Sequence, residues 1–337
     1  MTLAVLAGAA AQRLDVPLPW MIGPLFSVAL LRVAGVRLEA LPGGRQAGQW
    51  AIGTALGLYF TPAVVAQLAQ NAPLVLVVAV ASLFMGAVCA GFMLAFGRVD
   101  RSTAFFASLP GGASEMASLA ERAVARVDRV AAAHALRVMM VVSVVPFALT
   151  WYGPRGGDPG YVAIATAVDW ARFPTLAGIG VAGAMIFTLL RLANAWVLGP
   201  LFAVALVTAL EYRLTALPGV VVNAGQVLIG CSLGVRFSPE FFRAAPRFMT
   251  VAALGALLGL MLAFGLAAAL ATLVDVPLAT LSLATAPGGV AEMAITAKVL
   301  QLGVPLITAC HVLRVVVLTL AAAPAFRLFE RVMVGRR

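Results

Sequence analysis

Long apolar stretches separated by short polar ones dominate the chain. Apolar runs of 18 or more residues recur, which is long enough for a helix to cross a bilayer. The pattern predicts a hydrophobic helical segment at six places in each half of the chain. We therefore expect an all-α integral membrane protein. In the first half these segments are 1–13, 18–34, 43–60, 71–97, 101–124 and 128–150; in the second they are 172–191, 194–210, 218–236, 248–272, 278–301 and 304–324.

The two sets of segments carry the same landmarks. Trp20–Phe26, a Trp-x-x-Gly-Pro-Leu-Phe motif, recurs as Trp196–Phe202, 176 residues later. Gly48-Gln49 recurs as Gly225-Gln226, 177 residues later. A nearly constant offset over the whole chain indicates a duplication. We predict a first membrane repeat at 1–152, a linker at 153–170, a second membrane repeat at 171–325 and a basic cytoplasmic tail at 326–337.

The fifth segment of each half is interrupted at its middle. Ser108–Met116 reads Ser-Leu-Pro-Gly-Gly-Ala-Ser-Glu-Met and returns as Thr285–Met293, which reads Thr-Ala-Pro-Gly-Gly-Val-Ala-Glu-Met. Proline removes a backbone donor and glycine lets the chain turn, so each segment is predicted to be a re-entrant or broken helix. The four glycines are expected in backbone conformations that other residues reach only with strain: Gly111, Gly112, Gly288 and Gly289.

The distribution of basic residues selects the topology. A re-entrant fifth segment gives each half about five transmembrane helices and makes the two repeats inverted. Excluding Arg137 and Arg314 inside helices, that arrangement places 16 Lys and Arg residues on one side and 5 on the other, whereas a spanning fifth segment divides them 12 to 9. The positive-inside rule favours the inverted repeats, with both termini cytoplasmic. Arg101 and Arg122 should then both lie on the cytoplasmic side.

Composition narrows the function. Hydrophobic residues make up 63% of the chain and charged ones 11%, against about 25% charged in soluble domains. In a membrane protein, the net charge of +10 indicates cytoplasmic loops, and no soluble stretch is long enough for a helix-turn-helix DNA-binding module. Cys89, Cys231 and Cys310 lie in apolar segments without metal-ligand spacing. We expect no enzyme, no metal, no cofactor and no nucleic-acid partner.

A His-x-x-Arg motif follows each tip. The motif begins 19 residues after the tip glutamate in each half, as His134 with Arg137 and as His311 with Arg314. His134 and His311 are the two histidines of the chain. Counted from Asp128, Arg137 lies about 13 Å along its helix, near the middle of a bilayer. An arginine at that depth needs a partner.

The tip glutamates are the predicted partners of these arginines: Glu115 for Arg137, and Glu292 for Arg314. Two interpretations of each pair remain open. The pair is either a structural ion pair that holds the tip in place, or part of a site that binds a substrate or a coupling proton. The second interpretation follows from transporters, whose sites usually lie at paired discontinuous helices of inverted repeats. The glutamines at 49 and 226 either pack closely or face the polar centre. The candidate substrate- or ion-binding residues are Gly111, Gly112, Ser114, Glu115, His134, Arg137, Gly288, Gly289, Glu292, His311, Arg314, Gln49 and Gln226.

Leu109–Met116, His134–Val138 and their second-half copies resemble the membrane AbrB-duplication family, over nearly the whole chain. The resemblance implies a multi-pass protein of the bacterial inner membrane. Family members are commonly named AbrB-family regulators or ammonia monooxygenases. Two histidines do not supply the ligands that a copper or iron oxygenase needs. The segment 1–13 is shorter than the first helix of the family. The Pro-Gly-Gly tips are also similar to the broken helices of bile-acid-type symporters, at the level of fold alone.

Together the residues and the resemblance favour secondary transport of a small solute across the inner membrane, with the polar site at the two Pro-Gly-Gly breaks. The alternative is a membrane-embedded sensor or regulator that acts indirectly on gene expression, without binding DNA. The expected partners are the lipid bilayer and a small molecule or ion whose identity the sequence leaves open. Homo-oligomer formation is also left open.

Overall fold

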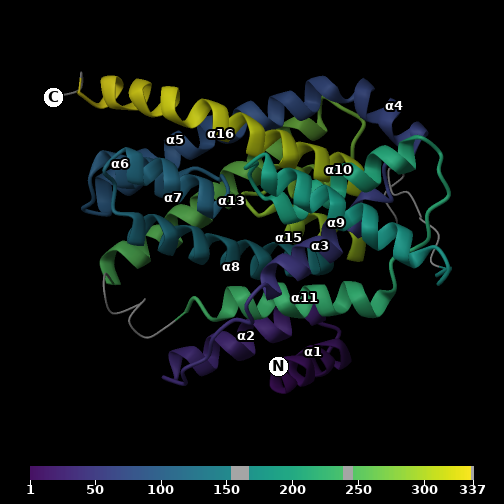
Figure 1. Ribbon diagram of the computed structural model, residues 1–337. Helices are drawn as coiled ribbons and strands as arrows, with labels where there is room; N and C mark the ends of the chain where they lie inside the picture. The colour runs from purple at the N-terminus through teal and green to yellow at the C-terminus, as the bar shows by residue number, and fades with distance from the viewer. Residues whose placement is uncertain (153–166, 238–245, 335–337) are drawn as a thin grey trace. The chain divides into compact units, whose positions relative to one another are not determined.

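The computed structural model describes residues 1–152, 167–237 and 246–334, and every element in these ranges is an α-helix, as predicted (Figure 1). Residues 153–166 of the predicted linker lie outside the described ranges. The helices are α1 Thr2–Arg13, α2 Pro19–Val33, α3 Gly44–Gly57, α4 Pro62–Gln70, α5 Ala72–Phe96, α6 Arg101–Ser108, α7 Ala113–Arg122, α8 Val127–Tyr152, α9 Phe173–Leu189, α10 Ala195–Ala209, α11 Gly219–Gly234, α13 Pro246–Ala271, α14 Leu278–Thr285, α15 Val290–Val299 and α16 Val304–Val334.

Within the described ranges, four helices are long and apolar enough to cross a membrane: α5, α8, α13 and α16. A fifth span results if α3 and α4, bent by 88° at a short break, are counted as one. The apolar helices α2, α9, α10 and α11 have 15 to 17 residues, or about 23–26 Å of length against about 30 Å of hydrocarbon. The all-helical membrane character is supported, while ten crossings in inverted repeats stay a prediction.

The chain forms two compact units that do not coincide with the two sequence repeats. The first unit comprises Met1–Ala72, Pro146–Glu240 and Val290–Thr308, and the second unit comprises Pro73–Val145, Phe241–Gly289 and Ala309–Arg337. Each unit therefore combines segments from both halves of the chain. The predicted tail from residue 326 continues α16 as helix to Val334.

Helices of the first unit approach one another at glycines, where the missing side chain lets backbones meet. Figure 1 shows α1, α2 and α11 side by side, and α10 likewise packs on α3 and α9. The approaches are reciprocal between the two halves. Gly57 of α3 faces the Leu201 carbonyl oxygen of α10, and Gly234 of α11 faces the Leu25 carbonyl oxygen of α2. Positions that match in sequence thus make matching contacts.

The second unit is built on a core of apolar side chains from α5, α6, α7, α8, α13 and α16. Phe105 and Phe106 of α6 form the centre, with ring centroids 5.3–5.4 Å from the Phe326 ring, and Phe105 also packs on Phe329. Aromatic rings bury large areas and pack in tilted pairs. This packing anchors α6, the helix that leads into the tip.

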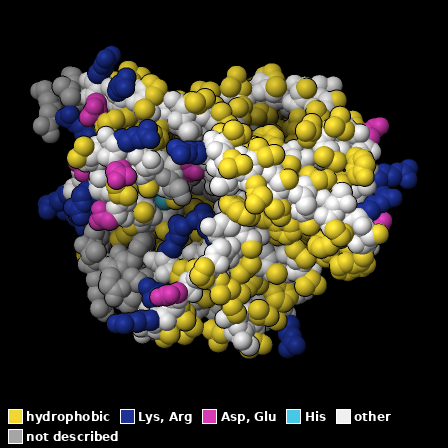
Figure 2. All heavy atoms as spheres, viewed as in Figure 1, with side chains coloured by type: hydrophobic (Ala, Val, Ile, Leu, Met, Phe, Trp, Pro, Cys, Tyr) yellow, Lys and Arg dark blue, Asp and Glu magenta, His cyan; other side chains and the backbone are white. Residues whose placement is uncertain are grey.

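The element formed by α6 and α7 has its two outer ends close together. The Asp100 carboxylate accepts hydrogen bonds from the Thr103 N–H and hydroxyl and so caps the start of α6. The Thr103 hydroxyl oxygen accepts from the Arg126 N–H at 2.8 Å, and α6 packs on α7. Figure 2 shows that the face turned toward the viewer carries both clusters of charged side chains and broad apolar surface. Arg122 and Arg126, at the end of this element, are exposed.

The tip between α6 and α7 turns without left-handed glycines. Gly112 has φ −65° and ψ 137°, and among the described glycines positive φ occurs at Gly35 and Gly43. The prediction of strained conformations at Gly111, Gly112, Gly288 and Gly289 is therefore wrong. The reason is that Pro110 lacks an N–H and Leu109 is extended, with ψ 132°, which ends α6 by itself.

Candidate functional site

His134 and Arg137 form a bonded pair on one face of α8. The Arg137 Nη2 group donates to His134 Nδ1 at 2.8 Å, and His134 Nε2 lies 2.9 Å from the Phe106 carbonyl oxygen. A guanidinium can only donate, so Nδ1 accepts and the hydrogen is on Nε2, which donates to the carbonyl. These two hydrogen bonds thereby define the tautomer and the orientation of the ring. The spacing of three residues places both side chains on one face of the helix.

Arg137 also binds the end of α6. Its Nη1 group donates to the Ser108 carbonyl oxygen at 3.2 Å and to that of Ala107 at 3.5 Å. The last carbonyls of a helix have no partner within it and carry the negative end of the helix dipole. The buried charge is therefore stabilised by the broken helix itself.

The predicted ion pair between Glu115 and Arg137 is wrong. Among the described residues, the side chains within ion-pair distance are the exposed pairs Arg126–Asp128 and Arg172–Asp169. Glu115 lies in the first turn of α7 and is half-buried. There the positive end of the helix dipole stabilises its carboxylate. Depth alone suggested that Arg137 needs an acid, but backbone carbonyls and a histidine provide acceptors instead.

In the second copy the histidine bonds the equivalent carbonyl, but the arginine bonds different ones. His311 Nε2 lies 2.9 Å from the Leu283 carbonyl oxygen, and Arg314 Nη2 donates to His311 Nδ1 at 2.6 Å. Arg314 also donates to the carbonyl oxygens of Ala286, at 2.6 Å, and Gly288. The second arginine is thus bonded to the tip itself.

The pairing of Glu292 with Arg314 stays a prediction, because Glu292 belongs to the first unit and Arg314 to the second. Within its own unit, the buried Glu292 acts on Arg236. Burial lowers the pKa of Arg236, the charge of Arg45 lowers it further, and the Glu292 carboxylate acts in the opposite direction. A like charge disfavours a cation and an opposite charge favours it.

Of the remaining candidates, the two glutamines belong to the first unit, whereas the His–Arg pairs belong to the second. Gln226 of α11 is buried and donates to the Asn223 side-chain oxygen at 3.4 Å. Gln49 of α3 is half-buried in the same first unit, so the prediction that the glutamines face the polar centre stays open. The side chain of Ser114 lies outside the described residues. Gly289 ends the second unit, before α15.

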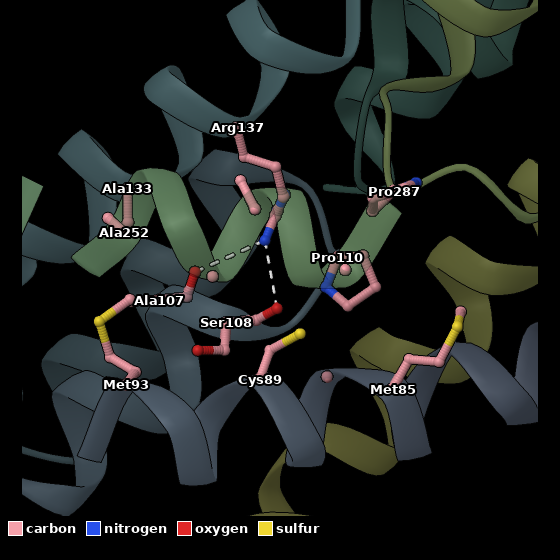
Figure 3. A pocket seen from close by; sticks show the side chains of 14 residues that line it. Met85, Cys89, Met93, Ala107, Ser108, Pro110, Ala133, Arg137, Ala252 and Pro287 are labelled. Atoms are coloured by element: carbon pink, nitrogen blue, oxygen red, sulfur yellow. Dashed lines mark hydrogen bonds between the residues drawn. The ribbon is translucent and has the colours of Figure 1, made fainter. Parts of the chain in front are cut away.

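A small cavity lies wholly within the second unit, beside the α6–α7 tip. Its volume is about 30 Å³, room for about two water molecules. Figure 3 shows Arg137 reaching into it from α8 toward Ser108, with Cys89 opposite and Pro110 and Pro287 at one end. The lining residues are Met85, Gly86, Cys89, Met93, Ala107, Ser108, Pro110, Ala133, Arg137, Ala252, Gly255, Ala256, Gly259 and Pro287.

Sequence reasoning missed most of this lining. Met85, Cys89 and Met93 recur every four residues and so share one face of α5, a signal that could have marked α5 as part of the site. Ser108 was part of the tip motif but was not singled out. Within the described part of the chain, no three His, Cys, Asp or Glu side chains gather as metal ligands.

Comparison with known proteins identifies the family. A family model described as transition state regulatory protein AbrB matches residues 20–330. The chain belongs to the AbrB family. This AbrB-family chain is 28% identical over 338 residues to "Uncharacterized protein YhjN" of Bacillus subtilis (strain 168), covering 92% of this chain and 87% of the relative. It is 23% identical over 319 residues to "Putative regulator AbrB" of Escherichia coli (strain K12), covering 93% and 90%. No solved structure matches.

Proposed function

We propose that this AbrB-family protein is a secondary transporter that carries a small solute across the bacterial inner membrane. The observation that carries the proposal is the cavity beside the tip, which is lined by a buried arginine that has no carboxylate partner among the described residues. Charged side chains inside membrane proteins are costly and usually mark substrate or ion pathways. Helix breaks at membrane depth are tolerated where they line such a cavity.

The arrangement of the α6–α7 element supports the inverted topology that we propose. The Thr103–Arg126 hydrogen bond holds the start of α6 near the start of α8, so Arg101 and Arg122 would lie on one side of the membrane. The predicted charge bias makes that side cytoplasmic, together with both termini. The repeats would then relate the two tips as in transporters with discontinuous helices.

The second candidate function is a membrane sensor that regulates gene expression indirectly. The description of the matching family model and the name of the Escherichia coli relative both refer to regulation, and they favour it. The cavity would then bind a solute without moving it. In both cases we propose no enzymatic step, no cofactor and no direct contact with nucleic acid; self-association stays open.

Flux measurement separates the two functions. The purified chain is reconstituted in liposomes and mixed with hyperosmotic sodium chloride, sodium formate, glycine, urea or ammonium chloride. Light scattering then follows shrinkage and the re-swelling that solute entry causes. A transporter should re-swell faster than protein-free liposomes with at least one solute, and Arg137→Gln should abolish that gain while Gly178→Ala, on exposed α9 surface, keeps it. Binding of a solute in detergent without any faster re-swelling would favour the sensor.

A further inference from the structure

The two copies of the His–Arg motif differ in what their arginines hold. Arg314 donates to the carbonyls of Ala286 and Gly288, which correspond to Leu109 and Gly111 by the offset of 177. Arg137 does not donate to these equivalents. Its bonds, at 3.2 and 3.5 Å, go to Ser108 and Ala107, in the preceding turn of helix. In the described structure the Leu109 and Gly111 carbonyls of the first tip are therefore not bonded to its arginine, whereas the equivalent carbonyls of the second tip are bonded to Arg314.

The hydroxyl groups next to the two tips also differ, because the one at the second tip is hydrogen-bonded and the one at the first tip is not, among the described residues. Thr285 ends α14, and its hydroxyl donates to the Leu281 carbonyl oxygen at 2.9 Å and lies 3.0 Å from that of Ala263. Its counterpart in the first copy is Ser108, whose buried Oγ has no hydrogen-bond partner among the described residues. Ser108 lines the cavity and Thr285 does not.

Two buried polar groups thus lie at the cavity without a complete set of partners. Arg137 is 6% exposed, and its Nε has no partner among the described residues, as is also true of the Arg314 Nε away from the cavity. Buried donors without partners are rare, and each one suggests a water or ligand that completes it. Figure 3 shows the Arg137 guanidinium beside Ser108 at the cavity.

The charge around the cavity selects the class of ligand. Among the described residues that line it, Arg137 is the sole charged one. Opposite charges interact strongly at low dielectric, so an anion is favoured. Met85, Cys89 and Met93 supply sulfur ligands that suit soft metal ions, but the buried charge of Arg137 opposes any cation.

We propose that this cavity binds one small monovalent anion, held by the Arg137 guanidinium and the Ser108 hydroxyl, and that the second copy of the motif only fastens its own tip. A volume of about 30 Å³ limits the ligand to about three heavy atoms, the size of chloride, formate or nitrite. This inference deepens the proposed function by naming the solute class. Arg137 and Ser108 are its binding residues, and His134 positions the guanidinium.

Binding is tested on the purified full-length protein in detergent, in sodium gluconate buffer, because gluconate is too large for the cavity. Sodium formate or sodium chloride is added, and the melting temperature is followed against concentration. A ligand of the native state raises it as the concentration passes the Kd. Choline formate in place of sodium formate should give the same shift, since the anion is the ligand.

Matched variants assign the effect. Ser108→Ala removes a hydroxyl without a partner, so it should fold normally and raise the Kd for formate about two- to tenfold. Arg137→Gln should raise it at least about tenfold. Thr285→Ala should lower the melting temperature by itself, because its hydroxyl is bonded, yet leave the Kd for formate unchanged.

Equal formate shifts in the native chain and in Ser108→Ala, or equal shifts with gluconate and formate, would overturn the anion site. Because binding is measured without a membrane, absence of flux with intact formate binding would refute transport alone. Flux of glycine or urea that Ser108→Ala leaves unchanged would refute the anion and leave the transporter.

Discussion

Replacing either of two equivalent glycines with alanine tests the reciprocal packing of the first unit. A Cβ at Gly57 would lie 2.6 Å from the Val204 Cβ and 2.8 Å from the Leu201 carbonyl oxygen. A Cβ at Gly234 would lie 2.7 Å from the Leu25 carbonyl oxygen and 2.9 Å from the Val28 Cβ. Carbon atoms in ordinary contact are about 3.5–4.0 Å apart, so the helices must separate in both variants.

The expected loss follows from these overlaps. Adding a methyl group to a packed core costs about 1–3 kcal/mol, while glycine to alanine in a helix gains at most about 1 kcal/mol. Gly57→Ala and Gly234→Ala should each lose about 1–2 kcal/mol of stability. Gly178→Ala is the matched control, because a Cβ there meets nothing within 4 Å, and it should gain about 0.5–1 kcal/mol.

The measurement is the melting temperature of each purified variant in one detergent. At about 2–4 °C per kcal/mol for a chain of this size class, the two packing variants should melt about 3–12 °C below the control. They should also resemble one another, because their contacts are equivalent. A melting temperature of Gly57→Ala or Gly234→Ala equal to that of Gly178→Ala would refute the close approach of that helix pair.

Three further predictions concern the second unit. Cysteines placed at Arg101 and Arg122 in a cysteine-free background should be labelled from the same side of the membrane; labelling from opposite sides would restore a spanning helix. Asp100→Ala should cost about 1 kcal/mol near neutral pH. Burial raises the pKa of Asp100, but hydrogen bonds to its carboxylate lower it below the usual value. The stabilisation is thus present above about pH 4 and lost as pH falls through the lowered pKa, so the two melting curves should converge in acid; a constant gap would refute the cap. His134→Leu should weaken formate binding, because Arg137 loses an acceptor, and His134→Asn, which keeps an acceptor oxygen, should restore part of it; equal Kd values for both variants would refute this positioning role.

The sequence carried enough information for the helices and for the His–Arg pairs. The lengths of the apolar runs and the Gly, Pro and polar residues that separate them predicted almost every helix of the described chain. The reason is that a helix depends mainly on residues close together in the sequence. The exception is α4, a helix whose cap, Thr61 followed by Pro62, was overlooked. The histidine and arginine of each pair meet because three residues separate them on one helix.

The partners of the arginines could not be predicted in the same way. A buried charge needs acceptors, but the sequence does not say whether a carboxylate or a row of backbone carbonyls supplies them. Glu115 is separated from Arg137 by a helix end and a turn, and their distance depends on how α7 packs. The cavity and the two units likewise depend on long-range packing, which no local pattern encodes.

The difference between the two copies, in contrast, is visible in the sequence once the structure shows where to look. Helix α7 carries Ser118, Glu121 and Arg122 on an exposed face, whereas α15 is buried along most of its length, from Val290 to Ala297. An amphipathic helix such as α7 is suited to a boundary, and α15 is buried although it carries Glu292 and Thr296. Duplication supplies two equal tips, but only the copy followed by an amphipathic helix can remain accessible while the other is enclosed. This difference in composition favours a cavity at the first tip, and at the second tip an arginine bonded to the tip carbonyls.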